Sequence, residues 1–165
     1  MELRTARLLL RRARRDDLDA LHAILSDPRA MRYMGRLPHD RLEQTAEWIE
    51  ELLAPQGGNR DLFLAEHEGR VIGRLGIWQR PEIGFAFHPD YWGRGLASEA
   101  LGAFIQHIFA TTTLAEITAD VDPRNTACLT LLTRLGFVIT GEAKNTVQAG
   151  DEWSDSLYLS LPRPR

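Results

Sequence analysis

The segment Glu82–Ala100 reads EIGFAFHPDYWGRGLASEA and holds the residues whose types and spacing are best suited to chemistry. Its pattern predicts a β-strand that passes through a short turn into a helix, with Gly93 and Gly95 among the first helical residues. Such a junction gathers free backbone N–H groups and the positive end of a helix dipole at one point. The segment is therefore predicted to bind an anion such as a phosphate or pyrophosphate.

This turn differs from two common phosphate-binding loops. No Gly-x-x-x-x-Gly-Lys-Ser/Thr sequence occurs in the chain, which excludes the nucleoside triphosphate loop. Gly93-Arg94-Gly95 begins like a dinucleotide fingerprint, but Ser98 stands at its third glycine position and weakens that interpretation. What remains is a compact turn in which Arg94 adds a charged contact and Ala97 is small enough for close backbone approach.

The same segment closely resembles the pyrophosphate-binding motif of the GNAT superfamily of acetyl-CoA-dependent N-acetyltransferases. The family pattern Gln/Arg-x-x-Gly-x-Gly/Ala aligns with Trp92–Ala97; the tryptophan departs from that pattern, but Tyr-Trp-Gly-(Lys/Arg)-Gly is the form seen in the RimJ/RimL-type branch. Residues 5–11 (TARLLLR) resemble the opening strand of that branch, and residues 122–125 (DPRN) with 135–137 (LGF) resemble its closing motif. Three ordered motifs at family-like spacing extend the resemblance over nearly the whole chain.

The resemblance implies acetyl-CoA as cofactor, coenzyme A as product, no metal, and direct transfer of the acetyl group to a primary amine in a ternary complex. The predicted cofactor contacts are Phe85, Ala86, Phe87, Gly93, Arg94, Gly95, Leu96, Ala97, Ser98 and Asn125. In the family, the residue at Asn125 bonds to the pantetheine amides. Helix capping is the alternative role for Asn125, and the two roles are compatible.

The chemistry of such a transfer sets three requirements. A primary amine is nucleophilic only when neutral, and an α-amine with a pKa of about 7.7–8.0 meets this condition more easily than lysine at about 10.4. A base, or a carboxylate that orients the amine through water, is therefore useful. The thioester oxygen gains negative charge and needs a donor, which a backbone N–H in residues 85–87 can supply. The departing thiolate needs a proton or a hydrogen bond.

Glu82 is the predicted catalytic carboxylate. It opens the strand that carries the cofactor contacts, which places its side chain near the cleft where the amine arrives. In related enzymes a glutamate at this place often helps to bind or deprotonate the amine. The alternative is a solvated glutamate at the end of a strand, or a salt-bridge partner, as most surface glutamates are. Both interpretations stand.

Cys128 is the predicted acid. The RimJ/RimL-type branch commonly has Asn-x-x-Ser, and here the pattern ends in Cys128, whose thiol can donate to a departing thiolate of similar pKa. Elsewhere in the superfamily a tyrosine takes this role, but that position is Leu132 here. Alternatively, Cys128 belongs to an apolar helical stripe with Leu131, Leu132 and Leu135 and only fills space, which is the simpler interpretation.

Composition limits the class of protein. The 165 residues suit one ordinary domain, and the resemblance implies that residues 1–165 form a single N-acetyltransferase domain. A net charge of −3 gives no electrostatic sign of a nucleic-acid partner. The apolar run Leu8–Leu10 is too short for a signal peptide or a membrane span, which favours a cytoplasmic location without a membrane partner. The single cysteine excludes an intrachain disulfide and a structural zinc cluster.

Several acceptors remain open at this point. A protein N-terminal amine, as in ribosomal-protein acetylation, and a small amine such as an amino acid, polyamine or antibiotic all fit. The absence of a pronounced acidic run argues mildly against a polyamine. Tyr33, Met34 and Trp48 are candidates for the acceptor cleft. The alternative function is a catalytically inactive acyl-CoA-binding or regulatory protein on the same fold, and the resemblance also allows a homodimer.

The elements that must position these residues alternate along the chain. The expected strands span residues 5–14, 62–67, 70–79, 82–88, 114–121, 136–143 and 152–161, and the expected helices span 16–25, 41–53, 94–110 and 124–135, with a helical turn after Pro28. This alternation predicts a mixed αβ layer fold of the α/β class with a central sheet flanked by helices. The resemblance makes it a GNAT-like fold with a mostly antiparallel sheet, split between the fourth and fifth strands to admit the pantetheine arm.

Overall fold

The computed structural model describes residues 1–165 as one eight-stranded sheet with five α-helices. The strands are β1 (Glu2–Arg4), β2 (Leu9–Arg11), β3 (Asp61–His67), β4 (Arg70–Gln79), β5 (Glu82–Phe87), β6 (Glu116–Val121), β7 (Val138–Ala149) and β8 (Glu152–Pro162). The helices are α1 (Leu18–Leu25), α2 (Pro28–Met31), α3 (Leu42–Leu53), α4 (Leu96–Thr111) and α5 (Thr126–Arg134). Short 3₁₀ turns at Arg15–Asp17 and Pro89–Tyr91 lead towards α1 and α4.

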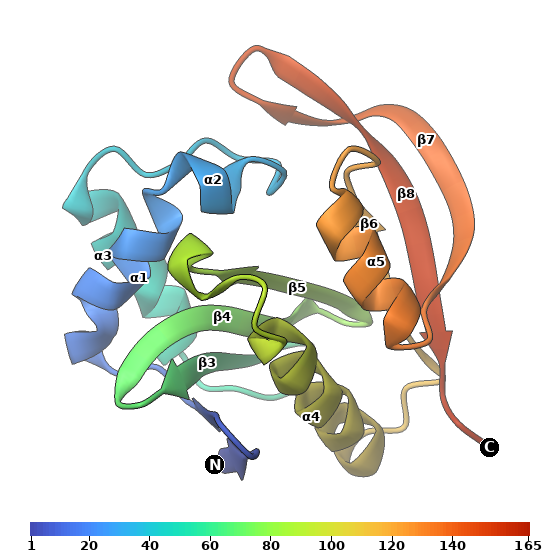
Figure 1. The fold of residues 1–165 in the computed structure, drawn as a ribbon, viewed down its shortest axis with the longest axis horizontal. Coiled ribbons are helices and arrows are strands. Elements are labelled where there is room, and N and C mark those ends of the chain that lie inside the picture. The colour runs from blue at the N-terminus through green and yellow to red at the C-terminus, as the bar shows by residue number, and fades with distance from the viewer.

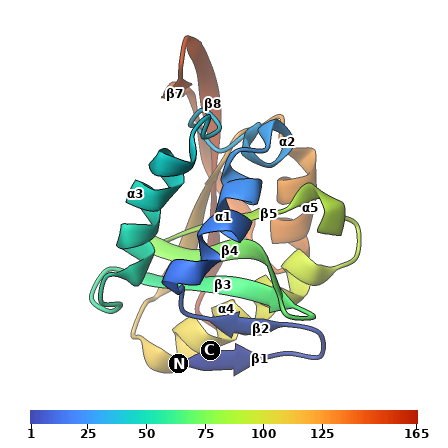
Figure 2. The ribbon, with the colours of Figure 1, turned by 90° about the vertical axis from the view of Figure 1, so that its left-hand side faces the viewer.

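The sheet has the order β1-β2-β3-β4-β5-β6-β8-β7, and all neighbours are antiparallel except β5 and β6. Helices α1 and α3 lie on one side of β3–β5 and α4 lies on the other (Figures 1 and 2). Leu21 of α1 and Ile49 of α3 pack on Leu62 of β3, whereas Phe104 of α4 belongs to a larger core that includes Leu75 of β4. The predicted mixed αβ fold with a mostly antiparallel sheet is confirmed.

The sheet is split between β5 and β6. These strands share a single register pair, Glu82 with Thr118, and then diverge, with α5 lying beside β6 (Figure 1). This confirms the split predicted between residues 82–88 and 114–121. The two strands are fifth and sixth in the structure because the N-terminal segment forms two strands instead of one. The divergence leaves one edge of β5 without a strand partner along most of its length.

The prediction of one strand over residues 5–14 is wrong. The segment instead contains the turn of a hairpin, in which β1 pairs with β2 from Glu2 opposite Arg11 to Arg4 opposite Leu9. The Thr5 N–H donates to the Leu8 carbonyl at 3.0 Å, and the Leu8 N–H donates to the Thr5 hydroxyl at 2.9 Å. A threonine side chain that bonds to nearby backbone competes with the sheet ladder, and this local competition ends the strand.

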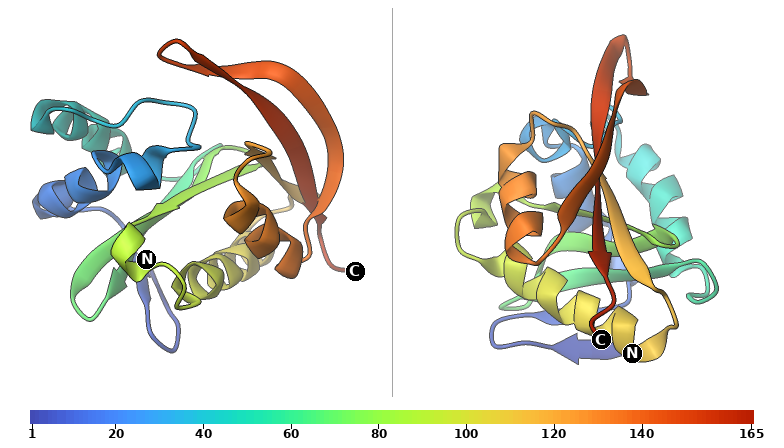
Figure 3. Two further views of the ribbon diagram at one scale, coloured as in Figure 1. Left: turned by 45° about the horizontal axis from the view of Figure 1, so that its top comes forward. Right: turned by 90° about the vertical axis from the view of Figure 1, so that its right-hand side faces the viewer.

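The β7–β8 hairpin is longer than predicted and extends beyond the rest of the molecule (Figure 3). The sequence predicted that its first strand ends near residue 143, but β7 continues to Ala149. The ladder is interrupted between Ala143 and Val147, where Asn145 has a positive φ of 51° and donates its N–H to Asp155 Oδ1 at 2.9 Å. Pairing with β8 therefore carries β7 past a polar stretch that looks like a loop in sequence.

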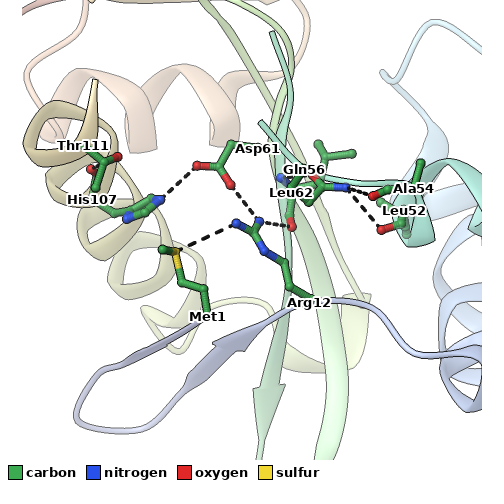
Figure 4. A network of polar contacts seen from close by, with 9 residues as sticks. All are labelled: Met1, Arg12, Leu52, Ala54, Gln56, Asp61, Leu62, His107 and Thr111. Carbon is green, nitrogen blue, oxygen red and sulfur yellow. Dashed lines mark hydrogen bonds and ion pairs between the residues drawn. The ribbon is translucent and has the colours of Figure 1, made fainter. Parts of the chain in front are cut away.

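A network of polar contacts links the start of β3 to α4 and the N-terminal segment (Figure 4). Asp61 Oδ2 lies 2.9 Å from His107 Nε2, and Asp61 Oδ1 accepts a hydrogen bond from Arg12 Nη1 at 2.7 Å. Arg12 Nη1 also donates to the Leu62 carbonyl at 2.7 Å. Because Asp61 and His107 are buried, these contacts satisfy groups that would otherwise destabilise the core.

The other predicted elements are confirmed with small shifts at their ends. The β3–β4 hairpin turns at Glu68 and Gly69, whose φ angles of 49° and 79° match a turn that needs positive φ at both central residues. Helices α1, α2, α3, α4 and α5 all occur within the predicted regions. None of these helices combines the length and apolar character that crossing a bilayer requires.

Candidate active site

The turn before α4 has the backbone shape of an anion site. Gly93 and Gly95 have φ angles of 75° and 74°, a conformation that glycine adopts without strain. Because Gly95 is the N-cap residue in this left-handed conformation, α4 begins at Leu96, two residues later than predicted. The first bond of the helix runs from the Glu99 N–H to the Gly95 carbonyl, so the N–H groups between them have no partner inside the helix.

The predicted contacts in this turn divide into side chains and backbone. The side chain of Leu96 is buried in the main core, so only its backbone N–H can meet a ligand. Ala97 and Ser98 are half-buried and present two further N–H groups of the first turn. Arg94 is exposed, and its guanidinium lies 5.3 Å from the centre of the Tyr91 ring. This group of N–H donors with one exposed arginine can bind a phosphate.

The open edge of β5 carries two further donors. The His88 N–H donates to the Ile72 carbonyl of β4 at 2.7 Å, and donors along an antiparallel strand alternate between its two sides. The Ala86 N–H therefore faces β4, whereas the N–H groups of Phe85 and Phe87 face the split. The Phe87 carbonyl accepts a hydrogen bond from Trp92 Nε1 at 2.9 Å, which holds the strand against the turn.

A cavity of about 250 Å³ occupies the split and continues towards α2 and α3. Glu82 and Phe85 line it from β5, and Asn125 and Cys128 line it from the start of α5. Its other side is lined by Tyr33, Met34 and Trp48, the residues predicted for the acceptor cleft. The structure thus brings together both predicted catalytic residues and the open edge of β5, at the place where the sheet divides.

Glu82 is exposed and lies where β5 meets β6. It forms no ion pair in this structure, which leaves the salt-bridge interpretation without support. The surrounding protein raises its pKa by desolvation, and the negative charge of Asp120 raises it further. A carboxylate with a raised pKa is a stronger base, which suits abstraction of a proton from an ammonium group.

The position of Cys128 is compatible with both of the roles predicted for it. It is half-buried, packs against the main core and lines the cavity. Burial raises the pKa of its thiol to about 12. A thiol with that pKa stays protonated and can donate a hydrogen bond, but it is a poor proton source for a thiolate whose own pKa is about 8.5. The raised pKa therefore favours hydrogen-bond donation over complete proton transfer.

Asn125 is the N-cap of α5. Its Oδ1 atom accepts a hydrogen bond from the Cys128 N–H at 3.2 Å, so the capping role is realised. Its side chain also lines the cavity, and the amide NH₂ group can still donate to a ligand there. The two roles considered for Asn125 are thus compatible in this geometry.

Sequence reasoning missed several residues of the cavity wall, among them Arg74, Trp78 and Asp120. Arg74 is 6% exposed, and its guanidinium lies 5.1 Å from the ring centre of Trp78 and 5.4 Å from that of Trp48. A signal was present in the sequence, because Arg74 interrupts the apolar run of a strand that reads RVIGRLGIWQ. A central strand buried on both faces rarely contains an arginine without a specific reason.

Comparison with known proteins shows the family of this chain. The sequence model of the "Acetyltransferase (GNAT) domain" matches residues 7–138. This chain is a member of the GNAT acetyltransferase family. The enzyme is accordingly an acyltransferase.

Two curated relatives are similar over most of their length. The enzyme is 32% identical to an uncharacterized N-acetyltransferase of Bacillus licheniformis over 96% of this chain and 94% of the relative. It is 25% identical to the spermidine N(1)-acetyltransferase of Escherichia coli strain K12, over 92% of this chain and 84% of the relative. The family assignment therefore extends beyond the matched domain to nearly the whole chain.

Solved structures show the same fold. A GNAT-family acetyltransferase from Bacillus anthracis superposes with a TM-score of 0.84, at 26% identity and 99% coverage of both chains. An acetyltransferase from Salmonella typhimurium, described as modifying the N-terminal serine of ribosomal protein L7/L12, gives a TM-score of 0.87 at 19% identity, with 98% of this chain and 99% of that chain covered. A RimL ribosomal-protein acetyltransferase is thus among the structural neighbours, which share the fold of this chain, and the RimJ/RimL-type branch stays a prediction.

Proposed function

We propose that residues 1–165 form a single N-acetyltransferase domain that uses acetyl-CoA to acetylate a primary amine in a ternary complex. The observation that carries this proposal is the arrangement along one strand, in which the turn at Gly93–Gly95 follows one end of β5, the edge of β5 beside the split is open, and Glu82 lines the cavity at the other end. The turn offers phosphate donors, the strand edge offers amide-type donors, and the far end offers a carboxylate. These groups follow one another in the same order as the pyrophosphate, the pantetheine arm and the acyl end of an acyl-CoA.

The residues of the chain fit acetyl-CoA in chemistry and shape. A Cβ atom added at Gly93 would meet no protein atom within 4 Å, and one added at Gly95 would meet only Arg7 Nη2 at 3.5 Å, so both positions leave open space beside the turn. The N–H groups of residues 96–98, with Arg94, would hold the pyrophosphate. The edge of β5 and the Asn125 amide would bond to the pantetheine arm. Bound there, acetyl-CoA supplies an activated acetyl group, and the prediction that no metal is needed stays a prediction.

Each catalytic requirement has a candidate in the cavity. Glu82 would orient the amine and accept its proton, directly or through water. The Phe85 N–H, which faces the split, would donate to the oxygen that gains negative charge during attack. The Cys128 thiol would hydrogen-bond the departing sulfur. The oxyanion donor is expected to make the largest single contribution, because it is fixed in the sheet before the reaction begins.

The acceptor would enter from the side of α2 and α3, between Tyr33, Met34 and Trp48. Relatives act on chemically different amines, since one acetylates spermidine and a structural neighbour modifies a protein N-terminal serine. A protein N-terminus and a small amine both satisfy the mechanism as stated. The proposed acceptor is therefore a primary amine of either class.

The deciding experiment combines calorimetric titration with acetyl-CoA and a thiol-release assay across peptides, amino acids, polyamines and aminoglycosides. We expect binding in the wild type and thiol release with at least one class. Gly95→Glu should abolish binding because it adds bulk and negative charge at the phosphate position. Gly102→Glu is the matched control: it adds the same charge to α4 about 10 Å further along, where nothing lies within 4 Å of an added side chain.

The alternative, a catalytically inactive acyl-CoA-binding or regulatory protein, predicts a different pattern. Such a protein would bind acetyl-CoA and lose binding in Gly95→Glu, yet release no thiol with any amine. Equal affinity of Gly95→Glu and wild type for acetyl-CoA would contradict the cofactor site itself.

A further inference from the structure

Arg74 is a buried cation that the chain leaves without a counter-ion. It lies in the middle of β4, is 6% exposed, and its Nε atom has no hydrogen-bond partner. Its guanidinium forms no ion pair and instead makes cation–π contacts with the rings of Trp48 and Trp78. Buried charges in proteins are as a rule paired or hydrogen-bonded, because burying an unpaired charge strongly destabilises the fold. Arg74 is therefore not explained by the stability of the fold.

The guanidinium faces the site described above. Arg74 is paired in register with Ala86 of β5, and its Nη1 atom lies 4.0 Å from the point where a side chain on Gly84 would begin. Because Gly84 has no side chain, the Arg74 guanidinium reaches the middle of β5. There it lies next to Phe85, whose N–H faces the split. Arg74 lines the same cavity as Glu82. It lies on the α3 side of the sheet, as its contact with Trp48 shows.

The charges around Arg74 do not neutralise it. Burial lowers its pKa to about 10, with a further contribution from Arg36, so it remains protonated at neutral pH. Three acidic residues line the cavity, but none pairs with it. Asp122 is held by Arg124 at 2.7 Å, and Glu82 and Asp120 lie together at the junction of β5 and β6. The cavity is therefore positive at Arg74 and negative at that junction.

We propose that Arg74 binds a carboxylate on the acceptor, so that the substrates of this enzyme are amines that carry a carboxylate a few bonds from the reacting nitrogen. This rests on the proposed function, because it names the acceptor class of the same cavity. An arginine fork binds a carboxylate with two parallel hydrogen bonds, and the two tryptophan rings restrict the plane of the fork. Glu82 receives the amine end of the same molecule.

The same arrangement disfavours a polyamine. Spermidine carries several positive charges at neutral pH, and one of them would approach Arg74 or Arg36 when the reacting amine is at Glu82. An acceptor with a carboxylate can be a free amino acid or dipeptide, or a peptide N-terminus with an acidic residue near it. Both sources present the same amine and carboxylate pair to the cavity.

The test compares acceptors that differ in one charge. Thiol release is measured with Ala-Gly and with its C-terminal amide, then with an Ala-Glu peptide amide and an Ala-Gln peptide amide, and with spermidine. We expect kcat/KM about 10- to 100-fold higher for the carboxylate member of at least one pair, in line with a charge-assisted bidentate contact. The pair that shows the difference identifies the source of the carboxylate. Spermidine should be slower than either preferred acceptor.

Variants of Arg74 separate binding from a structural role. Arg74→Met should abolish the preference for the carboxylate member, and Arg74→Lys should restore part of it because it keeps the charge without the fork. Arg70→Gln, at the exposed start of the same strand, should leave the preference unchanged. The thermal midpoint of Arg74→Met should be equal to or higher than that of the wild type, because the change removes an unpaired buried charge.

Two results would overturn the inference. One is equal kcat/KM for both members of each pair in the wild type. The other is a change in Arg74→Met that affects all acceptors equally with a raised KM for acetyl-CoA, which would assign Arg74 to the cofactor. Absence of turnover with every amine would contradict the proposed function. In that case calorimetry of the Ala-Gly pair with CoA-saturated wild type and Arg74→Met still decides whether Arg74 binds a carboxylate.

Discussion

Arg7 and Glu99 form a clamp that joins the N-terminal hairpin to the turn before α4. Arg7 Nε lies 2.7 Å from Glu99 Oε2, and the Arg7 backbone N–H donates to Glu99 Oε1 at 2.7 Å. The same guanidinium donates through Nη1 to the Arg94 carbonyl at 2.8 Å. Thr5 donates its hydroxyl to Glu99 Oε1 at 2.5 Å. The clamp therefore fixes the turn that contains the candidate phosphate donors.

Removal of this clamp should weaken cofactor binding. Arg7→Met loses the side-chain contacts to Glu99 and Arg94 and keeps only the backbone contact to Glu99. The turn must then be ordered when the ligand binds, and we expect a Kd for acetyl-CoA raised about 5- to 30-fold, as for loss of one or two charge-assisted hydrogen bonds. Calorimetry measures the change. Arg4→Met is the control, since Arg4 lies on the same hairpin, is 75% exposed and pairs only with Glu2. An unchanged Kd in Arg7→Met would show that the turn keeps its shape without the clamp.

The clamp should also weaken in acid. Burial raises the pKa of Glu99, but hydrogen bonds from Thr5 and Arg7 outweigh this and lower the pKa below its usual value. A lowered pKa in the folded state gives a contribution to stability that is present above about pH 4.3 and is lost as the pH falls through the folded value. The difference in unfolding midpoint between wild type and Glu99→Gln should therefore shrink as the pH falls below about 4.3.

Glu82→Gln should lower turnover and leave cofactor affinity unchanged. A general base contributes about 10²–10⁴-fold, so a loss of at least about 100-fold in kcat is expected, with equal Kd for acetyl-CoA. The acidic limb of the kcat/KM profile should lie above the usual glutamate range, because desolvation and Asp120 raise the pKa of Glu82. Wild-type kinetics in Glu82→Gln would leave this residue as a solvated strand end.

Asp120→Asn tests the electrostatic part of that account. Without the negative charge of Asp120, ionisation of Glu82 becomes easier, so its pKa falls and the acidic limb moves to lower pH. Steady-state rates from pH 5 to 9 reveal the shift. If the acidic limb of the pH–rate profile does not move, the limb reflects the ionisation of another group, such as the acceptor amine.

Cys128 gives a prediction in two parts. With the pKa of its thiol raised to about 12, alkylation by iodoacetamide at pH 8 should be about a thousandfold slower than for a free cysteine, because the thiolate is the reactive form. Cys128→Ser keeps a donor and should retain most of kcat, whereas Cys128→Ala should lose about tenfold. Equal kcat in both variants, with only a lower unfolding midpoint, would leave packing as the sole role of Cys128.

The network around Asp61 should matter for stability and not for catalysis. Asp61→Ala leaves His107 and Arg12 without their shared carboxylate, and breaking a buried pair of this kind costs about 3 kcal/mol of the free energy of unfolding. Urea unfolding measures that loss. The kcat of the folded variant should match the wild type, since none of these three residues lines the cavity.

Much of the fold follows from local patterns in the sequence. The turn with Gly93 and Gly95 and the helical stripes need only short-range periodicity, and they predicted α4 and α5 within two residues at their start. The family resemblance supplied the split between β5 and β6. By contrast, the hairpin at Thr5 depends on a side-chain bond to the backbone, and the length of β7 depends on its partner β8. Local patterns do not contain either contact.

The site was predictable in part for the same reason. Glu82 and Cys128 are recognisable because they belong to contiguous motifs, and the structure places both on one cavity. Arg74 was missed because its meaning depends on the register of β4 with β5 and on its contact with Trp48 of α3, which is distant in sequence. The assigned roles, the cytoplasmic location and the homodimer stay predictions.

The single register pair between β5 and β6 divides the sheet into two leaves that are joined at Glu82 and Thr118. A ligand that bonds to β5 on one side and to α5 on the other would connect the two leaves, as an additional strand between them would. Ligand at 100 times its Kd would then add about 2.7 kcal/mol to the stability of the whole. The free energy of unfolding of this enzyme would therefore depend on the concentration of acetyl-CoA around it.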